Sequence, residues 1–289
     1  MKIVRIDGGL GNQMFCYAFA IALQKKSNQP VYLDSHRYAF FPNHFGYELT
    51  SLFNIQLQEA TQLQLWKVTN VPYNVLMSKI LNLLPRRKTE IIEDYQKYEK
   101  NLMVELKDGY YIGNWQCYKY FDDYKKDIQR AFSFKNRLDK RNAIFMSELL
   151  EQNNTVSLHI RRGDYLSDSK YCGICELDYY KQALEHARNF VKGRLHCIIF
   201  SNDINWCKQN ILPLVYSDEV TFVDWNTGLD SHKDMRLMSA CRVNIIANSS
   251  FSWWAAYLNK RDNHLVIAPS KWINLPINYN VPCEEWLCI

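Results

Sequence analysis

Two adjacent arginines follow a short apolar segment in the middle of the chain. Residues 155–159, TVSLH, favour a buried β-strand, and Arg161 and Arg162 come directly after its end. In open α/β sheets, ligands bind at the carboxyl ends of the strands. Guanidinium groups pair with phosphate oxygens and stay charged at any working pH. We therefore interpret this segment, with His159, as a diphosphate site. The alternative is a surface ion pair with Asp164.

A second polar segment follows another expected strand, residues 243–247. Asn248, Ser249 and Ser250 stand at its end and can cap the helix expected over residues 251–258. Free N–H groups, hydroxyls and the positive end of the helix dipole make such a helix start favourable for phosphate. The segment carries no lysine, so the neighbouring arginines would supply the charge. Plain N-capping without a ligand is the alternative.

Two carboxylates extend this candidate site. Asp203 follows an expected strand and could hold ribose hydroxyls, and Asp234 lies in an expected helix, where it could accept N–H donors from a purine edge. Either residue could instead cap a helix or form an ion pair. No two aspartates in the sequence are separated by a single residue. Such a pair holds the metal in single-sheet sugar-nucleotide transferases, so we expect arginine and a helix dipole, without metal, to neutralise a leaving diphosphate.

A glycine-rich segment, Gly8 to Gln13, follows the first expected strand. It resembles the dinucleotide-binding fingerprint in two of its three glycines, but Met14 stands in the third position. Asp34 lies about 20 residues further on, where the fingerprint has its acidic residue. We expect a turn that lets backbone N–H groups and Asn12 approach a ligand. A tight strand-to-helix turn without a ligand is the alternative.

The remaining pattern supplies the elements that must position these residues. Alternating strands and helices predict an α/β protein with two Rossmann-like domains, 1–152 and 153–289. The expected strands lie at residues 3–6, 31–33, 110–115, 155–159, 195–200, 220–223, 243–247 and 265–268. The expected helices lie at residues 14–25, 57–84, 118–132, 138–150, 178–191, 206–211, 230–241 and 251–258.

Composition and charge limit the class of protein. The 289 residues include 35 basic and 30 acidic side chains, a net charge of +5, without a basic tail. This excess allows an anionic ligand but is too small to argue for nucleic acid. No apolar run reaches the roughly 20 residues of a membrane span, and the nine scattered cysteines fit a reducing compartment. We expect a cytoplasmic protein of bacterial type, without a signal peptide and with at most peripheral membrane association.

Several motifs occur in order along the chain. The most specific are GGLGNQM at residues 8–14, HIRRGDY at 159–165, FSND at 200–203 and NSSFSWW at 248–254. Lesser ones are YEL at 47–49, FNI at 53–55 and GNWQ at 113–116, whereas residues 56–105 carry none. With these motifs the chain resembles the galactoside α-1,2-fucosyltransferases, glycosyltransferase family 11.

The resemblance implies two Rossmann-like domains facing a cleft, the GT-B type of glycosyltransferase fold. It implies inverting transfer of fucose from GDP-fucose to the 2-hydroxyl of a terminal galactose in an oligosaccharide, with no required metal or other cofactor. The first domain would lie on the acceptor side and the second would bind the donor. His159 and Asp234 would face guanine. The residues expected to bind the donor are His159, Arg161, Arg162, Asn202, Asp203, Asp234, Ser249, Ser250 and Phe251.

For catalysis, we expect Arg161 to stabilise the negative charge that develops on the β-phosphate. Asn12 would reach the diphosphate and fucose from the first domain, and Asp7 or Asp164 is the candidate general base. Three other functions stay open. They are an NAD-dependent oxidoreductase that uses the glycine segment and Asp34, a non-catalytic anion- or carbohydrate-binding module, and a fucosyltransferase of the same fold with another acceptor or linkage.

Overall fold

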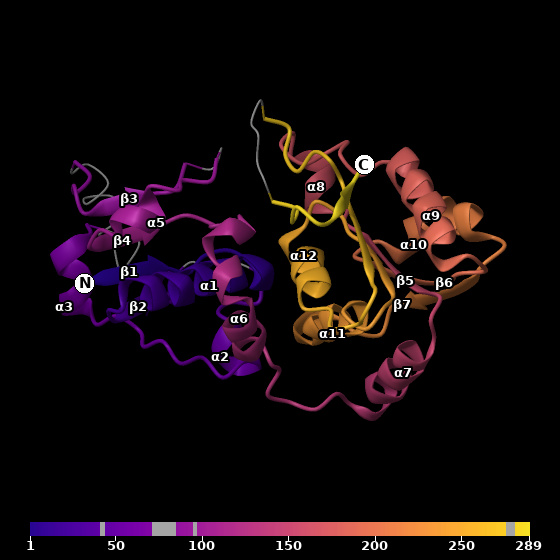
Figure 1. Cartoon of the computed structure of the whole chain (residues 1–289), viewed down its shortest axis with the longest axis horizontal. Coiled ribbons are helices and arrows are strands. Elements are labelled where there is room, and N and C mark those ends of the chain that lie inside the picture. Colours follow the sequence, from indigo (N-terminus) through magenta and orange to yellow (C-terminus); the bar gives the residue numbers. More distant parts are fainter. Residues whose placement is uncertain (41–43, 71–84, 95–96, 276–280) are drawn as a thin grey trace. The chain divides into compact units, whose positions relative to one another are not determined.

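The computed structural model describes residues 1–40, 44–70, 85–94, 97–275 and 281–289 (Figure 1). The chain forms two compact units, one built from Met1–Asn136 and the other from the described residues of Arg137–Pro276 and Pro282–Ile289. The expected boundary at residue 152 lies at the far end of helix α7 (Lys140–Glu151). This helix belongs to the second unit because its side chains, Asn142 among them, bond to residues of that unit.

The first unit contains a parallel sheet with the strand order β2-β1-β4-β3. Its strands are β1 (Lys2–Arg5), β2 (Val31–Asp34), β3 (Glu90–Ile92) and β4 (Gly109–Ile112). Its helices are α1 (Leu10–Ser27), α2 (Leu49–Leu52), α3 (Gln62–Val68), α5 (Leu102–Glu105) and α6 (Lys125–Ala131), with short 3-10 turns at His36–Ala39, Tyr118–Tyr120 and Asp122–Tyr124. Helix α1 is apolar on nearly every side, and accordingly it is buried from Leu10 to Leu23 apart from Asn12.

The expected strand, glycine segment, helix and strand at the start of the chain are confirmed, with one difference. Helix α1 begins at Leu10, so Asn12 lies in its first turn and not in a loop. The helix expected over residues 57–84 is wrong in its described part, because only α3 is helical there, started by a capping box between Thr61 and Gln64. Residues 71–84 lie outside the described residues. Strand β3 was not expected.

The second unit contains a larger parallel sheet with the order β10-β9-β8-β5-β6-β7. Its strands are β5 (Thr155–Ile160), β6 (His196–Ser201), β7 (Glu219–Val223), β8 (Val243–Ile245), β9 (Leu265–Ala268) and β10 (Leu287–Cys288). Its helices after α7 are α8 (Asp164–Ser167), α9 (Leu177–Val191), α10 (Ile204–Asn210), α11 (His232–Met238) and α12 (Ser250–Tyr257), with 3-10 turns at Leu212–Val215 and Gly228–Ser231. The strands expected in this half are confirmed to within two residues, and β10 and α8 were not expected.

The order of the second sheet reverses beside its central strand, β5. From β5 the chain runs through β6 and β7 to one edge, and then through β8 and β9 toward the other. Helices α9 and α10 lie on one side of this sheet and α11 and α12 on the other (Figure 1). All residues of β5 are buried, with Val156 and Leu158 fully inaccessible. In doubly wound sheets, ligands bind where the strand order reverses, which is here at the carboxyl ends of β5 and β8.

Candidate functional site

The two arginines follow the end of β5, and their side chains contact different residues. Arg161 donates to Asp164 Oδ1 over 2.8 Å, and its guanidinium lies 5.2 Å from the centre of the Tyr165 ring. Arg162 forms an ion pair with Asp203, Nε to Oδ2 3.4 Å, and its guanidinium stacks 3.8 Å above the Trp206 ring. The side chain of Arg161 is 28% exposed and that of Arg162 20%. The expected surface ion pair is therefore present, but both cations are largely covered.

The end of the neighbouring strand β6 fixes the backbone of this segment. The Arg162 N–H donates to Asn202 Oδ1 over 2.9 Å. Asp203 caps α10 by accepting from Trp206 N over 3.0 Å, so its carboxylate serves both a helix and an arginine. Gly163 has a φ of +61°, and a Cβ there would lie 2.6 Å from Asn202 Nδ2. Close approach of the two strand ends thus requires glycine at residue 163.

The start of α12 lies on the other side of β5, after β8. Ser249 is the N-cap residue of α12, yet its hydroxyl makes no capping hydrogen bond. Burial raises the pKa of the Tyr165 hydroxyl to about 12, and contacts with Arg161 and Ser249 oppose this rise. Tyr165 therefore lies between the arginine and the helix start. Ser250 and Phe251 form the first turn of α12, where the helix dipole favours an anion.

His159 is buried beneath this segment. Its ring centre lies 6.0 Å from that of Phe251. Burial lowers the pKa of His159 to about 3, and the charge of Arg161 acts in the same direction. The imidazole is therefore neutral at physiological pH, and its two nitrogens offer one donor and one acceptor.

Nitrogen atoms without a hydrogen-bond partner in the described part of the chain gather at this strand end, although Arg162 Nε lies in the ion pair with Asp203. Buried polar atoms are nearly always hydrogen-bonded, but His159 Nδ1, Arg161 Nε and Arg162 Nε have no hydrogen-bond partner among the described residues. The other such atoms belong to the first unit or to Arg242, which precedes β8 and so lies at the amino ends of the strands, away from this site. The arrangement suits an anion with several oxygen acceptors.

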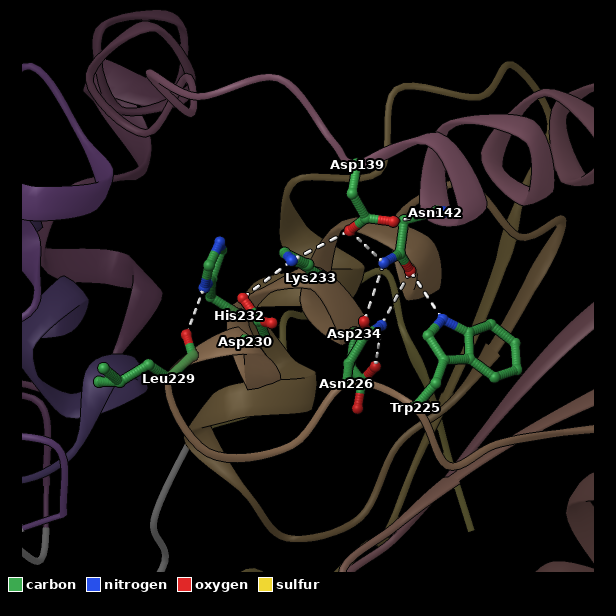
Figure 2. A network of polar contacts seen from close by, with 9 residues as sticks. All are labelled: Asp139, Asn142, Trp225, Asn226, Leu229, Asp230, His232, Lys233 and Asp234. Atoms are coloured by element: carbon green, nitrogen blue, oxygen red, sulfur yellow. Dashed lines mark hydrogen bonds and ion pairs between the residues drawn. The ribbon is translucent and has the colours of Figure 1, made fainter.

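Asp234 lies on α11 in a separate polar network (Figure 2). Asn226 Nδ2 donates to Asp234 Oδ1 over 2.8 Å. Burial raises the pKa of Asp234 to about 7, and the Asn226 hydrogen bond opposes this rise. A carboxylate with so few protein donors is suited to accept N–H donors from a ligand.

Asn12 and Asp7 belong to the first unit, so their expected roles toward a donor held by the second unit stay predictions. Asn12 Oδ1 accepts from Gln116 Nε2 over 2.7 Å, which joins the segments after β1 and β4. Asp7 pairs with Arg5 at 3.1 Å and with Arg37 at 3.6 Å. Two arginines and the Gly8 N–H occupy the Asp7 carboxylate, which leaves it little capacity to accept a proton from a substrate hydroxyl.

Asp34 does not fit the dinucleotide-binding alternative. Its carboxylate is buried and accepts from Tyr110 Oη over 2.6 Å and from the backbone of His36 over 3.1 Å. His36 Nδ1 lies 2.9 Å from the same carboxylate. These contacts occupy the group that would hold a ribose.

Sequence reasoning missed several residues that position the site: Asn142, Tyr165, Trp206, Trp225 and Asn226. Asn226 stands shortly after β7, as Asn202 does after β6, so the search for polar residues at strand ends could have found it. Trp206 and Trp225 each stack under an arginine, which no spacing in the sequence indicates. Trp253 and Trp254 are fully buried and therefore belong to the core.

No group of three or more His, Cys, Asp or Glu side chains in the described ranges is arranged to hold a metal ion. Within the same ranges, no helix combines the length and apolar character that a membrane crossing requires.

Similarity to known proteins covers the whole length of the chain. The model of glycosyl transferase family 11 matches residues 1–287. An α-1,2-colitosyltransferase of Escherichia coli is 34% identical, and the match covers 99% of this chain and 98% of that protein. Human galactoside α-(1,2)-fucosyltransferase 1 is 24% identical, over 98% of this chain and 69% of that protein.

Solved structures bear on the fold. The α-1,6-fucosyltransferase NodZ, co-crystallised with GDP, superposes with a TM-score of 0.52 at 14% identity, over 88% of this chain and 90% of that one. The expected α/β fold of GT-B type is thereby confirmed. The family match, the 34% identity and the fold agree, and the chain belongs to glycosyltransferase family 11.

Proposed function

We propose that the protein is an inverting α-1,2-fucosyltransferase that moves fucose from GDP-fucose to the 2-hydroxyl of a terminal galactose in an oligosaccharide. The observation that carries the proposal is the cluster of nitrogens without a hydrogen-bond partner within the described residues at the end of β5, which faces the start of α12 across Tyr165. Membership of family 11 supports a sugar transferase. A solved protein of the same fold, crystallised with GDP, supports a GDP-linked donor.

The diphosphate would lie between the arginines and the start of α12. Arg161 and Arg162 supply two permanent positive charges, and the first turn of α12 adds backbone N–H groups and the helix dipole. The Ser249 hydroxyl caps no backbone group and contacts Tyr165, so it could turn from Tyr165 to donate to a phosphate oxygen. This set can neutralise the diphosphate without a divalent ion.

Arg161 would act on the transition state. As the bond from fucose C1 to the diphosphate lengthens, negative charge grows on the β-phosphate while the acceptor hydroxyl attacks from the opposite face. Asp164, the present partner of Arg161, is an exposed carboxylate. Such an exposed pair is weak, so a phosphate can replace it at small cost. A preorganised donor stabilises developing charge without the solvent reorganisation that water would require.

Guanine would be held by His159 and Asp234. The neutral imidazole can bond to a polar group of the base, and the Asp234 carboxylate can accept from N1–H and the exocyclic amine. Asn202 and Asp203 would act mainly by fixing Arg162. The first unit would bind the acceptor, with Asn12 near the transferred sugar.

A donor panel tests the proposal. Purified protein is incubated with GDP-fucose, GDP-mannose and UDP-galactose, each with lactose and EDTA, and GDP or UDP release is measured. We expect release with GDP-fucose that depends on lactose, and an α-1,2 linkage in the product by NMR. Release only in the absence of EDTA, or only with a UDP-sugar, would contradict the proposal.

Colitose is the second candidate for the transferred sugar. The relative with 34% identity is an α-1,2-colitosyltransferase. Including GDP-colitose in the same panel separates the two, because the preferred donor gives the larger kcat/KM. Both candidates share the arrangement proposed for GDP.

A further inference from the structure

The Asp234 carboxylate ends a chain of hydrogen bonds that starts at helix α7 (Figure 2). Asn142 and Asn226 form a reciprocal amide pair, with both N–H···O distances 2.9 Å. Asn226 Nδ2 uses its second hydrogen to donate to Asp234 Oδ1 over 2.8 Å. Neither asparagine was expected from the sequence to take part in binding.

The partners of Asn142 fix which way both amides face. The indole Nε1–H of Trp225, which can only donate, reaches Asn142 Oδ1 over 3.0 Å. Asp139 is ionised because hydrogen bonds from Asn142 and Lys233 lower its pKa, so it can only accept, and Asn142 Nδ2 donates to it over 2.7 Å. The Asn142 amide therefore has one favourable orientation. Because Asn142 Oδ1 accepts from Asn226 Nδ2, the NH₂ group of Asn226 lies on the side of Asn142 and Asp234.

The donor-only indole is itself held in place. Arg141 lies 3.8 Å above the Trp225 ring, and the Phe145 ring meets it edge-on at 5.6 Å. Lys233 joins Asp139, the N-cap residue of α7, to Asp230 with distances of 3.0 and 2.8 Å. The network thus fastens α7 to α11 as well as orienting the amides.

We propose that Asn142 and Asn226 are positioning residues that hold Asp234 as a hydrogen-bond acceptor for the guanine edge of the donor. The proposal rests on the proposed function, since it takes GDP as the ligand. Asp234 Oδ2 accepts no hydrogen bond from the described residues. With Oδ1 held by an amide that cannot reverse, Oδ2 is directed at a ligand donor.

The charged groups around Asp234 bear on its titration. They are Asp139 and Arg141 on α7, Asp230 in the preceding 3-10 turn, and His232, Lys233 and Arg236 on α11, whereas α12 contributes no acidic or basic side chain. Burial raises the pKa of Asp234 to about 7 even though the Asn226 hydrogen bond lowers it. Removing the Asn226 donor must therefore raise this pKa further.

The test is isothermal titration of GDP into the full chain from about pH 6 to about pH 9, a range that spans the titration of Asp234. GDP requires the ionised carboxylate, so parent affinity falls below about pH 7. Asn226→Asp places two carboxylates in contact, which must share a proton. We expect roughly tenfold weaker binding at neutral pH and a midpoint about one pH unit higher, with recovery at alkaline pH. Trp225→Phe, which removes the indole donor and keeps an aromatic ring beside Arg141 and Phe145, should weaken binding about threefold.

Asn259→Asp is the matched control. Asn259 is a buried amide that donates to Cys241 O and Asn244 Oδ1, so it also loses donors without touching the Asp234 network. The control should keep the parent's pH midpoint. Folded Asn226→Asp with the parent's affinity and midpoint overturns the proposal. If Asn226→Asp does not fold, unchanged binding by Trp225→Phe overturns it instead. If the parent binds no GDP at any pH, the proposed function is wrong, and this proposal is wrong with it.

Discussion

The segments after β1 and β5 occupy equivalent places in two similar sheets, but they satisfy their polar groups differently. After β1, Asp7 bonds to Gly8 N over 3.0 Å and pairs with two arginines. The Gly8 carbonyl accepts from Gln13 Nε2 over 3.1 Å and from Tyr38 Oη over 2.6 Å. After β5, two guanidinium Nε atoms and one imidazole nitrogen lack a hydrogen-bond partner among the described residues. Arg5 Nε at the end of β1 also lacks a hydrogen-bond partner among these residues, but Arg5 and Arg37 converge on the one carboxylate of Asp7. The second segment instead places two arginines and a buried imidazole together, which suits an anionic ligand.

From this difference we expect the two units to have separate tasks. Polar groups that already bond within the protein leave few hydrogen-bond donors for a highly charged ligand. Arg161 and Arg162 are partly covered and each pairs with one carboxylate, so their remaining N–H donors can bind a diphosphate. Substitutions after β5 should therefore affect transfer much more than isosteric substitutions after β1.

The largest effect is expected for Arg161→Ala. Loss of a preorganised donor to the developing charge should lower kcat by about 10²- to 10³-fold. The measurement is GDP release with GDP-fucose and lactose, with folding checked by circular dichroism. Arg130→Ala is the control, because Arg130 is 79% exposed and pairs with Asp127 at 3.6 Å. If Arg161→Ala keeps activity within a few-fold of the parent, the segment after β5 is no more important for transfer than the segment after β1, and the account is wrong.

Asp234→Asn should weaken GDP binding by roughly ten- to a hundredfold, the contribution expected of hydrogen bonds to a charged group. It should also change stability with pH. The unfolded carboxyl ionises near pH 4, but burial raises the folded pKa to about 7. Between these values the unfolded state releases a proton that the folded state keeps, so the parent loses stability as pH rises through this window.

Asparagine cannot ionise, so the Tm advantage of Asp234→Asn over the parent should be larger at pH 8 than at pH 4. Thermal melts at both pH values measure this advantage. An advantage independent of pH would show that the buried carboxylate does not titrate as stated.

Gly163→Ala should reduce transfer about tenfold, because the new Cβ displaces Asn202, which accepts the Arg162 N–H. Gly173→Ala is a close control. Gly173 also has a positive φ, +72°, but a Cβ there meets nothing within 4 Å. Alanine is strained at both positions because both glycines have a positive φ, so the comparison of kcat/KM is made between variants whose folding has been checked. Equal activities would mean that this contact is not needed.

The smallest effect is expected for Asp7→Asn. Asp7 is bonded to Arg5, Arg37 and the Gly8 N–H, so it should not exchange protons during the reaction. We expect kcat/KM within about threefold of the parent and an unchanged pH–rate profile. Disappearance of the acidic limb of that profile would identify Asp7 as the general base and reverse the comparison.

The sequence pattern predicted the strands of the second unit to within two residues, except β10, whereas in the first unit it missed β3. The strands around Arg161 are short apolar segments that end in polar residues, and residues at their ends were identified correctly as neighbours. Strand β3, by contrast, has two isoleucines and one glutamate, and its place in the sheet depends on pairing with β4. Contacts between residues far apart in the sequence could not be predicted either. Asn142 and Asn226 are 84 positions apart and meet only because α7 packs on α11.

The most direct test of the central claim compares GDP with guanosine by calorimetry in EDTA, for the parent and for Arg161→Ala. If guanidinium groups and the start of α12 neutralise the diphosphate, the parent binds GDP at least about tenfold more tightly than guanosine without a divalent ion. Arg161→Ala should then lose most of that preference. A parent that prefers GDP only when a divalent ion is added, or a variant that keeps the full preference, would contradict the account.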